Sequence, residues 1–301
     1  METMPFPRTS THVTFPAGTT TGTGTVLAAE SLADGMVGLV VGVTPFHPLD
    51  HSWPDQPADT GTLRAGDAEY AVVDCVTGGV GPEDEFAIGA DIPVRRGDET
   101  WAWLAVHVLE PGVNGTALVG RAVSLEVDVP RRDALSAAHT GCHLLALALN
   151  EALADRWHTD VAEKNQPRRD AFGRPDFDGG AIGSSRIEID ASTDRYRLGK
   201  SLRKKGFEGE GLHEALPEIT DRVNARLAEW VDADAAVRVT APGPELTAKR
   251  TWSCELPEGT ATVFCGGTHL RHVGELASLT TVLTLSADGT ELVAVTTAKR
   301  R

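Results

Sequence analysis

Two short motifs in the chain each place two metal-capable side chains four residues apart. The first motif, His139-Thr140-Gly141-Cys142-His143, lies in a stretch rich in Ala and Leu and free of proline, at residues 134–153. Residues i and i+4 lie one above the other on a helix face, so both imidazoles of a helical segment can reach one point. The sequence therefore predicts a helix over residues 134–153, with Asp133 or Ser136 as its N-cap.

The second motif, Cys265-Gly266-Gly267-Thr268-His269, follows a β-like run that ends at Phe264. The two glycines allow a tight turn there. A thiolate and an imidazole from this turn, facing two imidazoles from the helix, make a set of ligands that suits Zn2+ best. Either pair alone is more often structural than metal-binding, but the two together, with the glycine turn, favour a metal site. The predicted metal ligands are His139, His143, Cys265 and His269.

A third pair, His47 and His51, has the same spacing but a different context. Prolines at positions 45, 48 and 54 exclude a regular helix around this pair, so the helical geometry does not apply. We expect both histidines to lie on a surface loop.

The segments that must position the metal ligands differ between the two halves of the chain. Residues 11–46 and 70–129 consist of short β-like runs separated by turns, which fits a small closed barrel of antiparallel strands. After Pro130 come the ligand-bearing helix, a polar loop at residues 158–180 and an amphipathic helix at residues 216–230, whose apolar residues recur every three or four positions.

Strands around residues 185–190 and in the C-terminal part complete the second half. Helices followed by runs of strands indicate an α+β fold, with helices packed on an antiparallel sheet. We therefore predict a β-barrel domain at residues 1–129 and a metal-binding α+β domain at residues 130–301.

The composition limits the possible functions. With 301 residues and 41% hydrophobic content, the chain can form packed cores. A formal net charge of −15 argues against a general nucleic-acid binder, because phosphate contacts need Lys and Arg. Local basic clusters remain, at residues 131–132, 168–169, 200–205 and 249–250.

Four cysteines do not form a disulfide framework in a chain of this length. The sequence contains neither an apolar run of about 18 residues nor a basic N-terminal region followed by an apolar core. We expect a cytoplasmic protein that does not bind membranes.

The order of the two metal motifs resembles the editing domain of alanyl-tRNA synthetase and its free-standing relatives, the alanyl-tRNA editing proteins; threonyl-tRNA synthetases carry a similar domain. The motifs that carry the resemblance are HTxxHLL from His139 and CGGTH from Cys265. Other segments resemble the family as well: Arg131-Arg132, Gly183-Ser184 with the run at 186–190, the helix at 216–230, and the segments at 44–48 and 56–63. The family's three glycines before Gln56 are replaced here by Leu49 to Asp55.

The resemblance implies a zinc-dependent hydrolase that removes a wrongly attached serine or glycine from alanine tRNA, with one Zn2+ per chain and the mischarged tRNA as partner. A bound metal can lower the pKa of a water molecule or polarise an ester carbonyl. No Glu follows the first histidine, so the His-Glu-x-x-His protease motif is absent, and the general base is unassigned.

Selection of serine requires a group that hydrogen-bonds its hydroxyl. The candidates for substrate binding are Thr140, Gln56, Ser184, Ser185 and Thr268. The threonines can instead serve local backbone bonds, and Gln56 can serve a turn. Two other functions remain open: a zinc hydrolase of another small ester or amide on the same fold, and a non-catalytic binding module that a metal stabilises.

Overall fold

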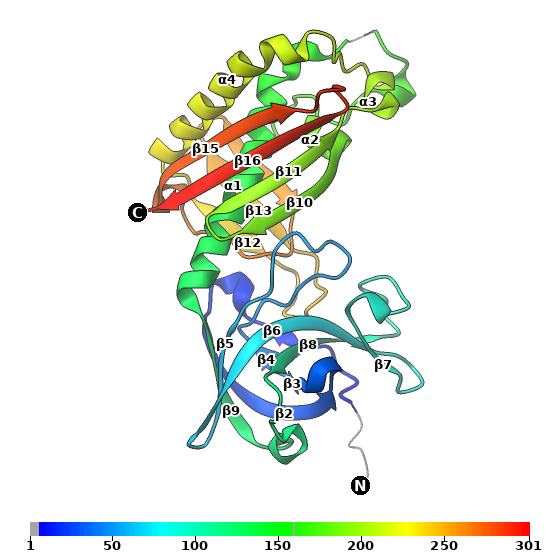
Figure 1. Cartoon of the computed structure of the whole chain (residues 1–301), viewed down its shortest axis with the longest axis vertical. Helices are drawn as coiled ribbons and strands as arrows, with labels where there is room; N and C mark the ends of the chain where they lie inside the picture. The colour runs from blue at the N-terminus through cyan, green and yellow to red at the C-terminus, as the bar shows by residue number, and fades with distance from the viewer. Residues whose placement is uncertain (1–5, 159) are drawn as a thin grey trace. The chain divides into compact units, whose positions relative to one another are not determined.

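The computed structural model describes residues 6–158 and 160–301 (Figure 1). The chain forms two compact units. The first comprises Met1–Asp133, Val239–Thr251 and Cys265–Thr268, and the second comprises Ala134–Arg238, Trp252–Phe264 and His269–Arg301. The division into domains at residues 1–129 and 130–301 stays a prediction.

The first unit contains a seven-stranded antiparallel sheet in the order β5-β9-β2-β3-β8-β6-β7. Strand β5 also pairs with β6, so that β2, β3, β5, β8 and β9 each have two hydrogen-bonded neighbours and β6 has three. The strands are β2 (Thr21–Ser31), β3 (Val37–Val41), β5 (Gly61–Ala65), β6 (Ala68–Val80), β7 (Phe86–Ile88), β8 (Ala102–Leu109) and β9 (Ala122–Val127). Two short strands, β1 (His12–Val13) and β4 (Val43–Thr44), pair in parallel.

The alternation of side chains along the strands explains which faces of this sheet are buried. In β9 every second residue is buried, as expected for a strand with one face on the core. All residues of β8 are buried, because this strand lies between β3 and β6 and contributes to a hydrophobic cluster on each face. Short 3-10 turns connect the strands: Phe15–Ala17, Ala33–Gly35, Gly89–Asp91 and Gly115–Leu118.

The second unit contains a four-stranded antiparallel sheet in the order β10-β11-β16-β15 and a three-stranded sheet in the order β12-β13-β14. The strands are β10 (Ile182–Glu188), β11 (Ala191–Arg197), β12 (Val237–Thr240), β13 (Thr251–Leu256), β14 (Gly259–Phe264), β15 (Leu276–Leu285) and β16 (Glu291–Arg300). The helices are α1 (Val129–Ala152), α2 (Phe177–Ala181), α3 (Lys200–Lys204) and α4 (Leu212–Asp232), with 3-10 turns at Ala154–Arg156, Glu163–Asn165 and Val273–Glu275. The prediction of an α+β protein with antiparallel sheets is confirmed.

Helix α4 packs on β15 in the way that its amphipathic pattern predicts. Its buried side chains include Ile219, Val223 and Leu227. At the contact, the side-chain Nδ2 group of Asn224 donates to the Thr281 carbonyl at 2.9 Å, and the Thr281 N–H donates to Oδ1 of Asn224 at 2.7 Å. This pair of hydrogen bonds fixes the register of the helix against the edge strand.

Helix α1 begins earlier than the sequence predicts, and the predicted N-caps are wrong. The helix starts at Val129, and the Asp128 carboxylate accepts the Arg131 N–H at 3.1 Å. Pro130 therefore lies in the first turn, where its missing N–H removes no intrahelical bond. Among the described residues, we find no helix with the length and apolar character needed to cross a membrane.

Candidate metal centre

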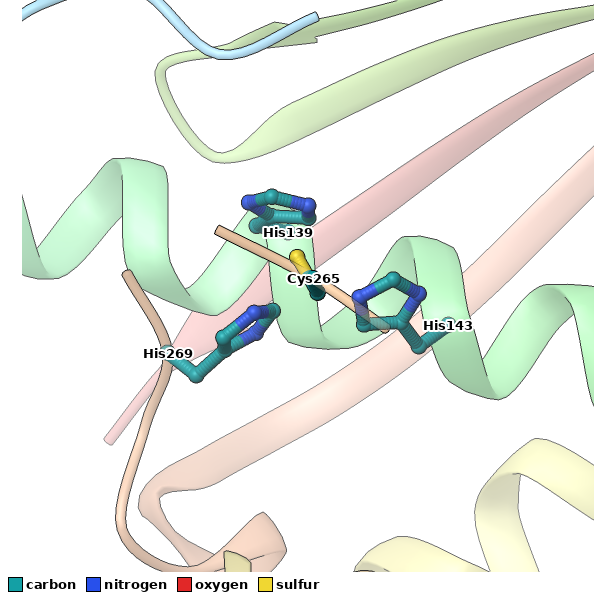
Figure 2. A group of neighbouring side chains, drawn as sticks. All are labelled: His139, His143, Cys265 and His269. Atoms are coloured by element: carbon teal, nitrogen blue, oxygen red, sulfur yellow. The ribbon is translucent and has the colours of Figure 1, made fainter. Parts of the chain in front are cut away.

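The four predicted ligands lie together. His139 and His143 project from α1, and Cys265 and His269 come from the segment that follows β14 (Figure 2). One potential ligand atom of each residue can be chosen so that all four atoms lie within 4.8 Å of one another. The ring centroid of His139 lies 5.0 Å from that of His143 and 4.4 Å from that of His269. This cluster could hold a metal ion.

Close packing of α1 fixes the direction of its two histidines. Leu135 and Ala138 are buried in a cluster with Ile187 of β10. A Cβ added at Gly141 would meet the Leu279 side chain of β15 at 2.7 Å, so glycine lets the helix lie close to this strand. Because Leu135, Ala138 and Gly141 pack against strands of the second unit, His139 and His143 lie together on a different face of α1.

Burial keeps the imidazoles in the form that binds a metal. It lowers the pKa of His139 to about 4. It also lowers the pKa of His143 well below its usual value, and the neighbouring His139 adds to this effect. Both rings are therefore neutral near pH 7, and a neutral imidazole offers a lone pair to a cation.

The environment of Cys265 disfavours a free thiolate. Burial raises the pKa of its thiol to about 12, with a further contribution from the Asp55 carboxylate, while the Gly267 N–H and Arg250 act in the opposite direction. A coordinated cation would offset the cost of the thiolate, because metal binding deprotonates a thiol.

The donor set fits a zinc ion. Three imidazoles and one thiolate are ligands that Zn2+ accepts in tetrahedral sites. In addition, the Nε2 atom of His143 is buried and has no hydrogen-bond partner within residues 6–158 and 160–301. Coordination is one way to satisfy such an atom.

Trp252, which the sequence analysis did not single out, packs against two of the histidines in the cluster. Its ring centroid lies 4.9 Å from that of His143 and 6.0 Å from that of His269. Trp252 lies in β13 and is fully buried. The sequence does not indicate this contact, because Trp252 lies more than 100 residues from the first motif and no helix or strand periodicity relates the two.

Thr140 is fully buried and contacts the second motif. Its Oγ1 atom accepts the Leu270 N–H at 3.1 Å and lies 3.3 Å from Nδ1 of His269. The substrate-binding role expected for Thr140 stays a prediction, and these contacts offer a different role for its hydroxyl.

Gln56 and Thr268 bind each other through two hydrogen bonds. The Gln56 Nε2 group donates to Thr268 Oγ1 at 2.8 Å, and the Thr268 N–H donates to Gln56 Oε1 at 3.0 Å. Both residues are buried. The pair therefore fixes the backbone of the turn directly before His269.

The two serine candidates lie on β10. Ser185 is buried, and its hydroxyl lies 3.7 Å from the Cys142 thiol, which also donates to Asp194 at 3.4 Å. Ser184 is half-buried and lies opposite Arg195 of β11. Their role in substrate binding stays a prediction.

The expectation that His47 and His51 are surface residues is wrong for His47. Its ring is buried and contacts Phe15 edge-on, at 5.0 Å between centroids. The His47 N–H donates to the Asp59 carboxylate at 2.5 Å, which ties the loop to a buried ion pair between Asp59 and Arg132. His51 is half-buried.

The chain is similar to several alanine–tRNA ligases. The enzyme of Parvibaculum lavamentivorans is 30% identical over 205 residues, which cover 64% of this chain and 20% of the ligase. The enzyme of Leptospira borgpetersenii is 26% identical over 251 residues, which cover 82% of this chain and 21% of the ligase. The enzyme of Ruegeria pomeroyi is 30% identical over 179 residues, which cover 54% and 17%.

The chain thus spans about a fifth of the length of these ligases. No protein-family model matches it. The relation to alanyl-tRNA synthetases that the two metal motifs predict is confirmed, since the chain is similar to one segment of the alanine–tRNA ligases.

Proposed function

We propose that this chain is a zinc-dependent deacylase that removes wrongly attached serine or glycine from alanine tRNA. The convergence of His139, His143, Cys265 and His269 carries this proposal. The similarity to alanine–tRNA ligases supports an aminoacyl ester as the substrate. A substrate of this kind places the activity in the cytoplasm.

The chain's own residues have distinct tasks in this proposal. When bound, Zn2+ would supply a Lewis acid for the ester carbonyl or for an attacking water molecule. The neutral rings of His139 and His143 would hold the ion, and Trp252 would exclude water from one side of them. The hydroxyls of Ser184, Ser185 and Thr268 remain candidates for contact with the misattached amino acid.

The fold supports the finer architecture that the motifs predict. The cyclic pairing of β2, β3, β5, β6, β8 and β9 supports a small barrel in the first unit. We therefore propose that the chain combines a barrel domain with an editing domain, in the order expected at residues 1–129 and 130–301.

The tRNA partner requires an exposed basic surface on an acidic protein. The basic clusters at residues 131–132 and 249–250 each have only one arginine or lysine available for such a surface. Arg132 is buried in an ion pair with Asp59, and Arg250 is buried and donates to backbone carbonyls of the first unit. The segment at residues 195–205 holds six Lys or Arg and no Asp or Glu. Its side chains Arg197, Lys200, Arg203 and Lys204 are exposed, so we propose that it contacts tRNA phosphates.

The function can be tested by deacylation of alanine tRNA charged with serine, glycine or alanine. We expect the protein to hydrolyse the first two and to spare alanyl-tRNA. A chelator and the substitution His139→Ala should each abolish the activity, and added Zn2+ should restore it only after chelation. Hydrolysis that persists in both cases would refute a metal-dependent reaction.

Three observations favour other functions. The net charge of −15 and the replaced glycines at residues 49–55 favour a hydrolase of a smaller ester or amide. Turnover of small esters without any tRNA binding would support this hydrolase function. A complete set of four protein ligands is typical of structural zinc sites. Bound zinc without either activity would support a binding module.

A further inference from the structure

We propose that Thr140 is a positioning residue that sets the tautomer of His269 and holds the backbone of Leu270. The inference rests on the metal site of the proposed function and assigns to Thr140 a role other than substrate selection. Thr140, His269 and Leu270 all belong to the second unit.

The hydrogen-bond partners of Thr140 carry the inference. A hydroxyl can donate one hydrogen bond and accept two. The Leu270 N–H uses one acceptor position of Thr140 Oγ1 at 3.1 Å. The His269 ring nitrogen Nδ1 lies 3.3 Å from the same oxygen, either as a donor or as an acceptor.

Metal coordination selects between these two arrangements. If the Thr140 hydroxyl donated to Nδ1, the proton of the neutral ring would lie on Nε2, which could then not bind a cation. If Nδ1–H donates to Thr140, Nε2 carries the lone pair. Metal-binding histidines commonly donate their other ring N–H to an oxygen in this way. The arrangement in which Nδ1–H donates to Thr140 is therefore the one that lets His269 bind a metal ion.

This arrangement leaves Thr140 without an acceptor position for a substrate. Both lone pairs of its oxygen would be used, by Leu270 N–H and by His269 Nδ1–H. The side chain is also fully buried. Its own proton can be donated to a carbonyl of the preceding helical turn, as is common for threonine in helices.

The test compares Thr140→Val with Thr140→Ser by Zn2+ affinity, measured in competition with a chromophoric chelator. Valine keeps the shape but removes the oxygen, so we expect Zn2+ to bind about 10- to 100-fold more weakly. Serine keeps the oxygen and should bind within a few-fold of the unsubstituted protein. The Co2+ absorption spectrum should change in the valine variant and be restored in the serine variant.

A second measurement needs no variant. Nitrogen-15 NMR of the zinc-loaded protein should show His269 protonated at Nδ1 and metal-bound through Nε2. Protonation at Nε2 would overturn the inference. The inference would also be overturned if Thr140→Val bound Zn2+ as tightly as the unsubstituted protein but hydrolysed seryl- and glycyl-tRNA in a changed ratio. If the unsubstituted protein binds no Zn2+, the proposed function fails first, and this inference fails with it.

Discussion

The imidazole of His143 shows how a single buried atom points to a ligand. Its ring lies against Trp252, and its Nε2 atom has no hydrogen-bond partner among the residues that the structure describes. A buried polar atom without a partner costs about 1–3 kcal/mol of stability. Coordination of a cation by the histidine would remove this cost without any change in the fold.

We expect His143→Ala to weaken Zn2+ binding at least ~100-fold, because the variant loses one of the four side chains that would hold the ion. Affinity can be measured by chelator competition. The matched control is His51→Ala, which removes a half-buried histidine outside the cluster and should leave the affinity unchanged. Equal affinities in the two variants would exclude His143 as a ligand.

A second residue-level prediction concerns Asp178, whose carboxyl is hydrogen-bonded by Tyr196. Burial raises the pKa of Asp178 from 3.8 to about 7, and the nearby Asp194 adds to the shift. The folded state therefore holds this proton more tightly than the unfolded chain, so stability is lost as pH rises from about 4 to about 7.

In the metal-free protein we expect Asp178→Asn to remove this loss, which is on the order of 2–4 kcal/mol across that range. Denaturant unfolding at several pH values measures it. The exposed Asp221 of α4 offers a control, since Asp221→Asn should keep the pH profile of the unsubstituted protein. A stability difference between Asp178→Asn and the unsubstituted protein that does not vary with pH would contradict the prediction.

At the scale of elements, the turn between β14 and His269 depends on a partner from another loop. Gln56 supplies both a donor and an acceptor to Thr268, in a buried pair of hydrogen bonds. The turn contains Gly266 and Gly267 and therefore has little conformational preference of its own. The contact from Gln56 compensates for that freedom.

The substitution Gln56→Leu should lower the free energy of unfolding by about 1–3 kcal/mol, because it removes the side-chain oxygen that accepts the buried Thr268 N–H. Denaturant unfolding of the metal-free protein measures this cost. Gln166 is exposed, so Gln166→Leu is a matched control that should stay within about 0.5 kcal/mol. Equal stability of the two variants would show that the pair contributes nothing.

At the scale of the whole molecule, charge distribution decides whether tRNA binding is compatible with a net charge of −15. Helix α3 presents Lys200, Arg203 and Lys204 to solvent, and we find no carboxylate ion pair for these three within the part of the chain that the structure describes. A cluster of this kind can bind phosphates even on an acidic protein, because screening limits interactions with distant charges.

Reversal of these three charges to Glu should weaken tRNA binding and reduce its dependence on salt, by roughly one unit of slope for each lost phosphate contact. Binding to alanine tRNA between low and moderate salt measures both. The control reverses Arg95, Arg121 and Lys249, which are exposed in the first unit. A larger effect in the control than in the α3 variant would place the tRNA surface elsewhere.

The ligand-bearing helix and the amphipathic helix could be predicted from the sequence, because their side-chain periodicity is local. Residues 134–153 and 216–230 lie almost entirely within α1 and α4. The first residue of α1 could not be predicted, since Pro130 and the capping carboxylate of Asp128 extend this helix at its N-terminal end. The α+β class followed from the order of the elements.

The sequence by itself determined which side chains could bind a metal, because ligand type and spacing are written in the two motifs. Only the tertiary structure decided that the two motifs meet, that Trp252 lies against them and that Thr140 and Gln56 are engaged by the second motif. These contacts join residues far apart in the chain, and their partners are selected by packing and by the need to satisfy buried hydrogen-bonding groups, neither of which leaves a local pattern.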